Sequence, residues 1–287
     1  MTRSQFAVAQ SMAVIGARPR PIVHRTRGRR HGPITRLMSP SDLGHTLKPF
    51  VFLDLFDTEG TSISGLALHP HSGIATLTYL LEGSARYEDT TGATGILPQG
   101  GVEWFKAGHG AWHGGGAGES GRTRGFQLWI ALPPEHELDP AESIYQAPQE
   151  IRRVGPASVL LGTLGAVSSA LPAPSSATYM AVRLTAGESW RYEPLADHMV
   201  CWIALGRGRL AVPELVEAGE LVAFEPSTEA IDVHAEADTE FVLGSAASHP
   251  HELALGYYSV HTSAASLQAG ERRIAEIKAR LHGEGRL

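Results

Sequence analysis

Residues 69–83, HPHSGIATLTYLLEG, place two histidines one residue apart at the head of an apolar run. In an extended strand, side chains at positions i and i+2 point to the same face, so His69 and His71 face one side and Pro70 faces the other. Imidazole is a common ligand of divalent transition metals. The stretch therefore predicts a buried strand that carries two candidate metal ligands into one interior.

Short apolar runs bounded by turn-forming residues recur along the chain, which has 32 glycines and 18 prolines among 287 residues. They include TLTYLLEG, FQLWIAL, MAVRLTAG, CWIALG, LVAFE and TEFVLGS. Runs of about four to eight residues predict an all-β fold, a many-stranded sandwich or barrel. One helix is expected at the C-terminus, where Leu267, Ile274, Ile277 and Leu281 share a helical face and Thr262 or Ser263 can cap the start.

The order of features repeats along the chain, which suggests a duplicated β-barrel. TYLLEGSARYED and LPQGGVEWFKAG in the first half match CWIALGRGRLAV and LVEAGELVAFEP in the second. Aligning Gly83 with Gly206 and Gly101 with Gly219 gives the second-half counterparts of His69, His71 and His113, which are Tyr192, Pro194 and Ile231. The second barrel is therefore expected to be free of metal.

A small-residue and proline-rich stretch, residues 165–177, separates the two halves and predicts a linker. We therefore expect an Arg-rich N-terminal arm or first strand over residues 1–36 and an N-terminal barrel with the metal site over residues 37–164. A second barrel with a short C-terminal helix is expected over residues 178–287.

Charge and composition exclude several classes of protein. The net charge is −6, yet residues 1–36 carry eight arginines and no acidic residue, so we expect these arginines to pair with an acidic body. Nothing resembles a base-reading module, and no apolar run approaches the ~18 residues of a membrane span. Cys201 is the single cysteine, and FAVAQSMAVIGA lacks a clean signal-peptide cleavage site. A cytoplasmic protein without specific nucleic-acid or membrane binding is expected.

A third candidate ligand stands in AGHGAWHGGG, where a glycine-rich turn carries His109 and His113. Such a turn lets the backbone approach closely and can aim His113 inward. With 14 histidines in the chain, close spacings also arise by chance, and the second HPH string, His249 to His251, is interpreted as surface loop. His109 is a further possible ligand, but we expect it to line the pocket or face solvent.

These stretches resemble the pirin family of the cupin superfamily. The family pattern at the corresponding places is approximately HPHRGFETVTYLLEG, GDVQWMTAGRGIVHSE and GIQLWVNLP, matched here by HPHSGIATLTYLLEG, GGVEWFKAGHGAWH and GFQLWIALP. The resemblance implies two tandem antiparallel cupin (jelly-roll) barrels with metal in the N-terminal barrel only. It implies His69, His71 and His113 as ligands, with a glutamate two residues after His113.

That fourth ligand is absent, because Gly115 stands at its position and Ala75 stands where a wider cupin pattern has glutamate. Glu103 and Glu119 are nearby substitutes. Three alternatives stay open, in order of preference: a three-histidine site completed by water, a protein that is largely metal-free when isolated, and a pocket that binds a ligand without metal. If the missing ligand weakens the site, Gly115→Glu should raise the metal affinity.

The resemblance implies two functions. One is a metal-dependent dioxygenase of the quercetin 2,3-dioxygenase type, acting on a flavonol or similar enolic small molecule, with one divalent metal. Fe(II) is the first choice, and Ni, Cu or Zn are compatible with three imidazoles. His109 is then the remaining candidate general base. The alternative is a non-enzymatic metal- or redox-sensing regulator that binds a protein partner. We favour the enzyme, because an inward metal pocket most economically serves small-molecule chemistry.

Overall fold

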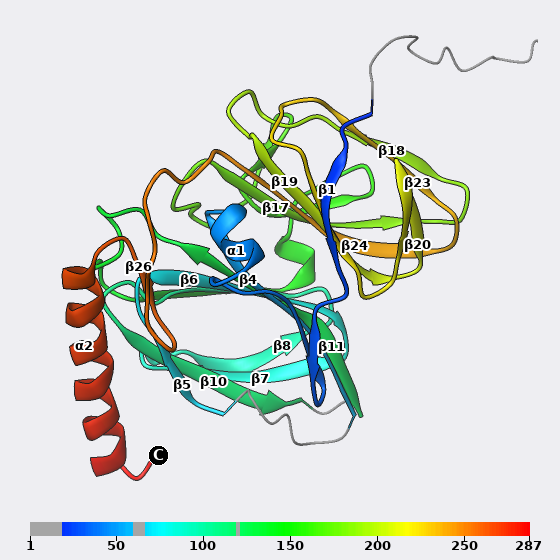
Figure 1. The fold of residues 1–287 in the computed structure, drawn as a ribbon. Helices are drawn as coiled ribbons and strands as arrows, with labels where there is room; N and C mark the ends of the chain where they lie inside the picture. The colour runs from blue at the N-terminus through cyan, green and yellow to red at the C-terminus, as the bar shows by residue number, and fades with distance from the viewer. Residues whose placement is uncertain (1–18, 60–66, 119–120) are drawn as a thin grey trace, which may run out of the picture.

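The computed structural model describes residues 19–59, 67–118 and 121–287. Its described part consists almost entirely of β-strands arranged as two barrels, with a short helix α1 (Leu43–Thr46) and a C-terminal helix α2 (Ala264–Gly283). Figure 1 shows the two barrels one above the other, with α2 on the outside of the first. The expected all-β fold with a C-terminal helix is confirmed. Arg3, Arg18, Glu119 and the segment FAVAQSMAVIGA lie outside the described residues.

The first barrel is built from two antiparallel sheets. The larger has the spatial order β12 (Glu142–Gln146), β9 (Val102–Lys106), β6 (Ile74–Glu82), β11 (Arg122–Ala131), β4 (Phe50–Glu59), β3 (Ile34–Met38), β2 (Arg29–His31). The smaller has the order β5 (His69–His71), β10 (Ala111–Ala117), β7 (Ser84–Asp89), β8 (Thr94–Pro98).

The second barrel repeats this plan. Its larger sheet has the order β1 (Ile22–Thr26), β22 (Leu221–Phe224), β19 (Val200–Arg207), β24 (Thr239–Ala246), β17 (Ala177–Leu184), β14 (Ala157–Leu161), β13 (Arg153–Val154). Its smaller sheet has the order β18 (Ser189–Tyr192), β23 (Ile231–Ala235), β20 (Arg209–Val212), β21 (Glu214–Glu217). The sequence repeat therefore corresponds to two copies of one strand order.

The strand register agrees with the alignment of the two halves. His69 on β5 lies opposite His113 on β10, and Tyr192 on β18 lies opposite Ile231 on β23. Tyr192 and Ile231 are buried in the apolar core of the second barrel. The positions that carry two histidines in the first barrel therefore carry core residues in the second.

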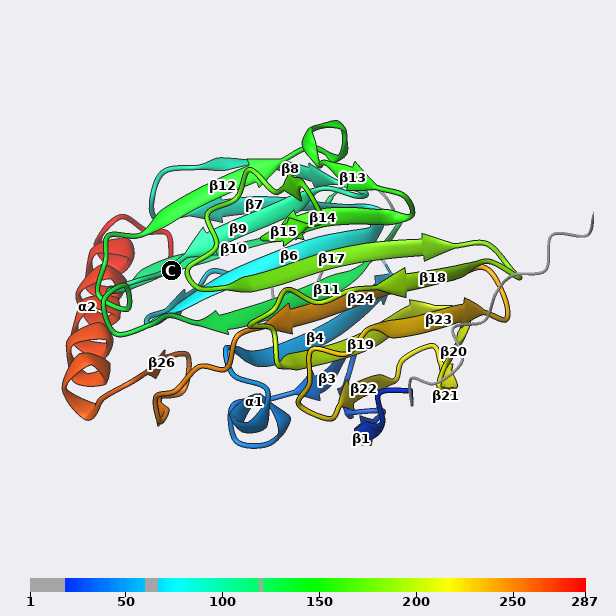
Figure 2. The same ribbon diagram turned by 90° about the horizontal axis from the view of Figure 1, so that it is seen from above.

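The two larger sheets pack face to face, as Figure 2 shows from above, and their contact forms the main apolar core. Leu77 and Tyr79 of β6 meet Tyr179 and Trp202 of the second barrel in this core. Because side chains alternate along a strand, the β6 residues that alternate with Leu77 and Tyr79 face the interior of the first barrel. Ala75 also belongs to the contact between the barrels. It points away from the histidines, so a glutamate at this position would not be a ligand in this fold.

The N-terminal region does not form a separate arm over its described residues. β1 pairs with β22 of the second barrel, whereas β2 and β3 join the sheet of the first barrel. Its arginines bond to the body of the protein: Arg20 donates to the carbonyls of Glu225 and Met199, Arg25 pairs with Glu214 at 3.5 Å, and Arg27 pairs with Glu220 at 3.3 Å. The N-terminal region therefore links the two barrels, because its first strand belongs to one barrel and its next two strands belong to the other.

The element η1 (Pro148–Glu150) lies between β12 of the first barrel and β13 of the second, and the short pair β15 (Thr163–Leu164) and β16 (Val167–Ser168) lies between β14 and β17. β13 and β14 precede the expected linker yet already belong to the sheet of the second barrel. The domain boundaries given above stay a prediction.

After the second barrel the chain returns to the first. It forms the hairpin β25 (Ala254–Leu255) and β26 (Val260–His261), then α2, which packs against β10 and receives the Trp112 Nε1–H on the Ile274 carbonyl at 3.0 Å. Ser263 caps α2 by accepting the Ser266 N–H at 3.1 Å. Neither helix in the described part of the chain has the apolar length that a membrane crossing requires.

Candidate metal centre

Three histidines meet inside the first barrel. His69 and His71 come from β5, and His113 comes from the neighbouring strand β10. One ligand atom from each lies within 4.8 Å of the others, and in the described part of the chain this is the one such group of three or more possible metal ligands. The structure thus brings together the three residues that the sequence singled out.

Hydrogen bonds fix how the first two imidazoles face. His69 donates through Nδ1 to the Ala67 carbonyl at 2.8 Å, and His71 donates through Nδ1 to the Tyr258 carbonyl at 2.9 Å. A carbonyl only accepts, so these bonds place the ring proton on Nδ1 and leave Nε2 with a free lone pair. Nε2 of His71 is buried and has no hydrogen-bond partner among the described residues. Such an orphaned acceptor suits a metal ion.

His113 is held by a carboxylate. Its Nδ1 lies 2.9 Å from Oε1 of Glu103 on β9, and its ring stacks on Phe105 at 4.3 Å with an interplanar angle of 3°. Its Nε2 is likewise buried without a partner in the described part of the chain. In many metal sites a carboxylate accepts a hydrogen bond from the ring nitrogen of a ligand histidine that does not bind the metal. This bond fixes the ring and increases the basicity of the ligand nitrogen.

Glu103 is itself enclosed by donors. Its Oε2 accepts the Thr78 hydroxyl at 2.7 Å, and its Oε1 accepts the Tyr145 hydroxyl at 3.4 Å. Burial acts to raise the pKa of Glu103, but the charge and hydrogen bond of His113, together with the Thr78 bond, hold this pKa below its ordinary value. Glu103 was considered from the sequence only as a substitute ligand, and the structure places it behind a ligand.

The strand register explains how Glu103 comes to lie in a polar row. Residues directly opposite one another on six adjacent strands all carry polar side chains, and the row is Tyr145, Glu103, Thr78, Gln127, Asp54 and Arg36. These side chains alternate with residues of the apolar contact between the barrels, so the row faces the interior of the first barrel. Hydrogen bonds join Tyr145 and Thr78 to Glu103 at one end of the row and Arg36 to Asp54 at the other.

The missing carboxylate at Gly115 has a steric reason. A Cβ at Gly115 would lie 1.7 Å from the Arg86 carbonyl oxygen of β7, far inside contact distance. Close pairing of β10 with β7 therefore excludes any side chain there. The expectation that Gly115→Glu raises the metal affinity stays a prediction, and this contact argues against it, since the new side chain would first have to push the two strands apart.

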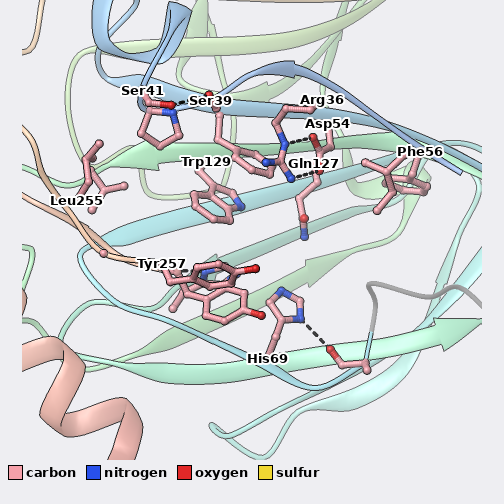
Figure 3. Close-up of a pocket in the computed structure, with 18 of the residues that line it drawn as sticks. Arg36, Ser39, Ser41, Asp54, Phe56, His69, Gln127, Trp129, Leu255 and Tyr257 are labelled. Carbon is pink, nitrogen blue, oxygen red and sulfur yellow. Dashed lines mark hydrogen bonds and ion pairs between the residues drawn. The ribbon is translucent and has the colours of Figure 1, made fainter. Parts of the chain in front are cut away.

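A pocket of about 640 Å³ is lined by His69 and His71, whereas His113 lines a smaller adjoining cavity of about 30 Å³ that it shares with His69. Figure 3 shows Trp129 and Gln127 on one side of the larger pocket and His69 and Tyr257 on the other, with the Arg36–Asp54 pair at the edge. Arg36 bonds to Asp54 through two contacts of 2.5 and 3.1 Å. Burial raises the pKa of Asp54 although the hydrogen bond and charge of Arg36 oppose this shift.

Aromatic planes form the apolar wall of this pocket. The Arg36 guanidinium lies 3.9 Å from the centre of the Phe52 ring, Phe52 stacks on Trp129 at 4.0 Å, and Trp129 meets the ring of His71 at 4.7 Å. The Trp129 Nε1–H is buried and has no partner among the described residues. The wall can therefore hold a flat ring and has one hydrogen-bond donor to offer.

The C-terminal hairpin closes the opposite wall. Its Tyr257 and Tyr258 line the pocket, and Tyr257 is 86% exposed at the entrance. The hairpin is anchored next to His71, because Ser72 donates to Ser259 at 2.9 Å and contacts His261 Nε2 at 2.9 Å. These residues were not identified from the sequence as part of the site, since they lie far from His71 in the chain and match no metal motif.

The structure does not bring His109 to the three histidines. His109 lines a separate hollow beside α2, together with Thr90 and Arg273, and its backbone N–H donates to the Asp139 carbonyl at 2.9 Å. Its role as a base stays a prediction. In the second HPH string, His251 is exposed as expected, whereas His249 is buried, so the interpretation of both as surface residues is wrong for His249.

The burial of the histidines leads to a prediction of how the stability of the metal-free protein depends on pH. Burial, followed by the neighbouring histidines, lowers the pKa of His69 from 6.5 to about 4 and that of His71 well below 6.5. As the pH falls below about 6.5, the unfolded chain binds protons that the folded chain refuses, so the free energy of unfolding decreases. We expect the Tm measured in chelator to fall between about pH 6.5 and pH 4, and to fall less steeply in His71→Asn. A Tm that stays constant over this range would contradict the burial of these rings.

Known proteins of similar sequence belong to one named family. The family model described as Pirin matches residues 32–130. A "Pirin-like protein" of Caulobacter vibrioides is 33% identical over 192 residues, which are 62% of this chain and 68% of that protein. A Pseudomonas aeruginosa protein named "Putative quercetin 2,3-dioxygenase PA3240" is 42% identical over 109 residues, and the match spans only 38% of its length.

Solved structures share the fold. A quercetin 2,3-dioxygenase from Acinetobacter baumannii superposes with a TM-score of 0.83 at 20% identity, covering 91% of this chain and 98% of that one. The bacterial pirin YhhW of Escherichia coli, in complex with nickel(II), gives a TM-score of 0.64 at 21% identity, with 80% and 98% covered. Together with the sequence match to the Caulobacter protein, these similarities show that the chain belongs to the pirin family of the cupin superfamily.

Proposed function

We propose that this chain is a metal-dependent dioxygenase of the quercetin 2,3-dioxygenase type, which acts on a flavonol or a similar enolic aromatic molecule. The observation that carries the proposal is the three-histidine group, of which His69 and His71 line an aromatic-walled pocket of about 640 Å³. The names of the Pseudomonas relative and the Acinetobacter structure support it.

His69, His71 and His113 would hold one divalent ion, with Fe(II) as the first choice and Ni, Cu or Zn as alternatives. Three neutral imidazoles leave coordination positions open, and the bound ion would supply Lewis-acid or redox chemistry there. The remaining work belongs to the pocket. Trp129 and Phe52 offer a face on which a flat ring can stack, and the Trp129 Nε1–H can donate to a substrate oxygen.

Proton transfer and exclusion of water also have candidate residues. Asp54 is the one carboxylate among the described residues that line this pocket, and its raised pKa suits a group that takes a proton from an enolic hydroxyl. Tyr257 at the entrance can cover a bound ring. In this proposal Asp54 takes the part of base that the sequence suggested for His109.

Oxygen uptake tests the proposal directly. Protein reconstituted with Fe(II) is expected to hold close to one equivalent of metal and to consume O2 when quercetin is added, and a sample stripped by chelator should not. Metal content below about a tenth of an equivalent after reconstitution would refute the metal site. A fully loaded protein that consumes no O2 would refute the enzyme and favour a metal-sensing regulator with a protein partner.

A further inference from the structure

Among the described residues, the group of possible ligands contains three imidazoles and no carboxylate. A divalent ion bound by neutral groups alone would keep its full charge inside a largely buried site, which is costly in a region of low dielectric constant. A compensating negative charge is therefore expected close to the ligands. Gly115 cannot supply it, because the Arg86 carbonyl occupies the space that a side chain would need.

Glu103 is the buried carboxylate in contact with the group. It is 7% exposed, and its Oε1 lies 2.9 Å from Nδ1 of His113, the ring nitrogen that faces away from the other two histidines. The His113 ring cannot easily turn away from it, since Phe105 stacks flat against one face at 4.3 Å. Thr78 fixes the second oxygen of Glu103 at 2.7 Å. Negative charge is thus held one imidazole away from the ion.

We propose that Glu103 is the positioning residue that compensates the charge of the metal site, acting through His113 in place of a carboxylate ligand. The inference rests on the proposed metal binding. It implies that the negative charge of Glu103 compensates the ion through the His113 ring, without direct coordination. The site then keeps more coordination positions free for substrate than a site with a fourth protein ligand would have.

The test compares Glu103→Gln with the wild type by calorimetric titration of the full chain with Ni(II) and, without oxygen, with Fe(II). Gln keeps the size of the side chain and an acceptor for the Nδ1–H but removes the charge. We expect the metal affinity to fall by about 10- to 100-fold, the range typical when a residue that hydrogen-bonds to a metal ligand is replaced. The matched control is Asp89→Asn, a buried carboxylate that accepts from the same Tyr145 at 3.0 Å, and it should leave the affinity nearly unchanged.

A second measurement separates a charge effect from a structural one. A carboxylate near iron stabilises Fe(III) more than Fe(II), so Glu103→Gln should move the midpoint potential to a more positive value. Thr78→Val, which removes the bond to Oε2 and keeps the carboxylate, should weaken metal binding less and keeps the proposal testable if Glu103→Gln folds poorly.

The outcomes are distinguishable. If the wild type binds metal and Glu103→Gln binds it equally well with an unshifted potential, the role of Glu103 is refuted and the metal site stands. If the wild type itself binds neither Ni(II) nor Fe(II), the proposed function and the role of Glu103 both fail.

Discussion

Replacing His71 with alanine is expected to weaken metal binding by more than about 100-fold. This loss exceeds the one expected from removing a group that only hydrogen-bonds to a ligand. His71 is fully buried, its Nδ1 is fixed by the Tyr258 carbonyl, and its Nε2 has no other partner among the described residues. Two imidazoles would remain, and two ligands do not hold a catalytic ion tightly. In thermal unfolding, the stabilisation of about 2.7 kcal/mol expected at a metal concentration 100 times Kd should disappear.

His251→Ala is the matched control, because His251 ends the second HPH string in the same chain. His251 is exposed and does not belong to the group of possible ligands. Its replacement should leave both the metal affinity and the metal-dependent rise in Tm unchanged. Equal losses in the two variants, or none in His71→Ala, would mean that the ion binds elsewhere.

Gly115→Ala is expected to destabilise the protein by about 1–3 kcal/mol, the usual cost of inserting atoms into a well-packed region. The added Cβ would lie 1.7 Å from the Arg86 carbonyl oxygen, so β10 and β7 would have to separate at this point. His113 lies on β10 only two residues away. Because the strands move, the metal affinity should fall as well, although no ligand is changed. Chemical denaturation and metal titration of the same variant measure the two effects.

The next glycine along the strand offers the control. A Cβ at Gly116 meets nothing within 4 Å, so Gly116→Ala should have little effect on stability or should raise it slightly. If Gly115→Ala proved as stable as Gly116→Ala, the close approach of the two strands would be wrong, and Gly115→Glu would again become a reasonable way to add a ligand.

The sequence predicted the parts of the molecule that depend on local pattern. The alternation of apolar and turn-forming residues indicated two barrels, and the i, i+2 spacing put His69 and His71 on one face. Equivalent glycines in the two halves placed Tyr192 and Ile231 opposite one another, as the register of β18 and β23 bears out. Each of these inferences needs only residues that are close in sequence, or two copies of the same pattern.

The rest depends on pairing between distant segments, which a single sequence does not reveal. From the sequence, Glu103 was a nearby substitute for the missing ligand, and no local pattern indicated that it lies next to His113. Only the pairing of β9 with β6, and of β10 with β5 and β7, brings it behind His113. His109 shows the opposite case, since it stands four residues from His113 in sequence yet lines another hollow.

The return of the chain from the second barrel to the first sets an order of assembly. Tyr258, whose carbonyl orients His71, follows that histidine by 187 residues, and the hairpin that carries it is reached only after the second barrel is complete. A growing chain that has folded its first barrel on the ribosome would therefore still lack one wall of the pocket and the acceptor that sets the tautomer of a ligand. Under the proposed metal binding, acquisition of the ion would be a late event in the maturation of the protein, which follows the folding of the second barrel and the docking of the hairpin.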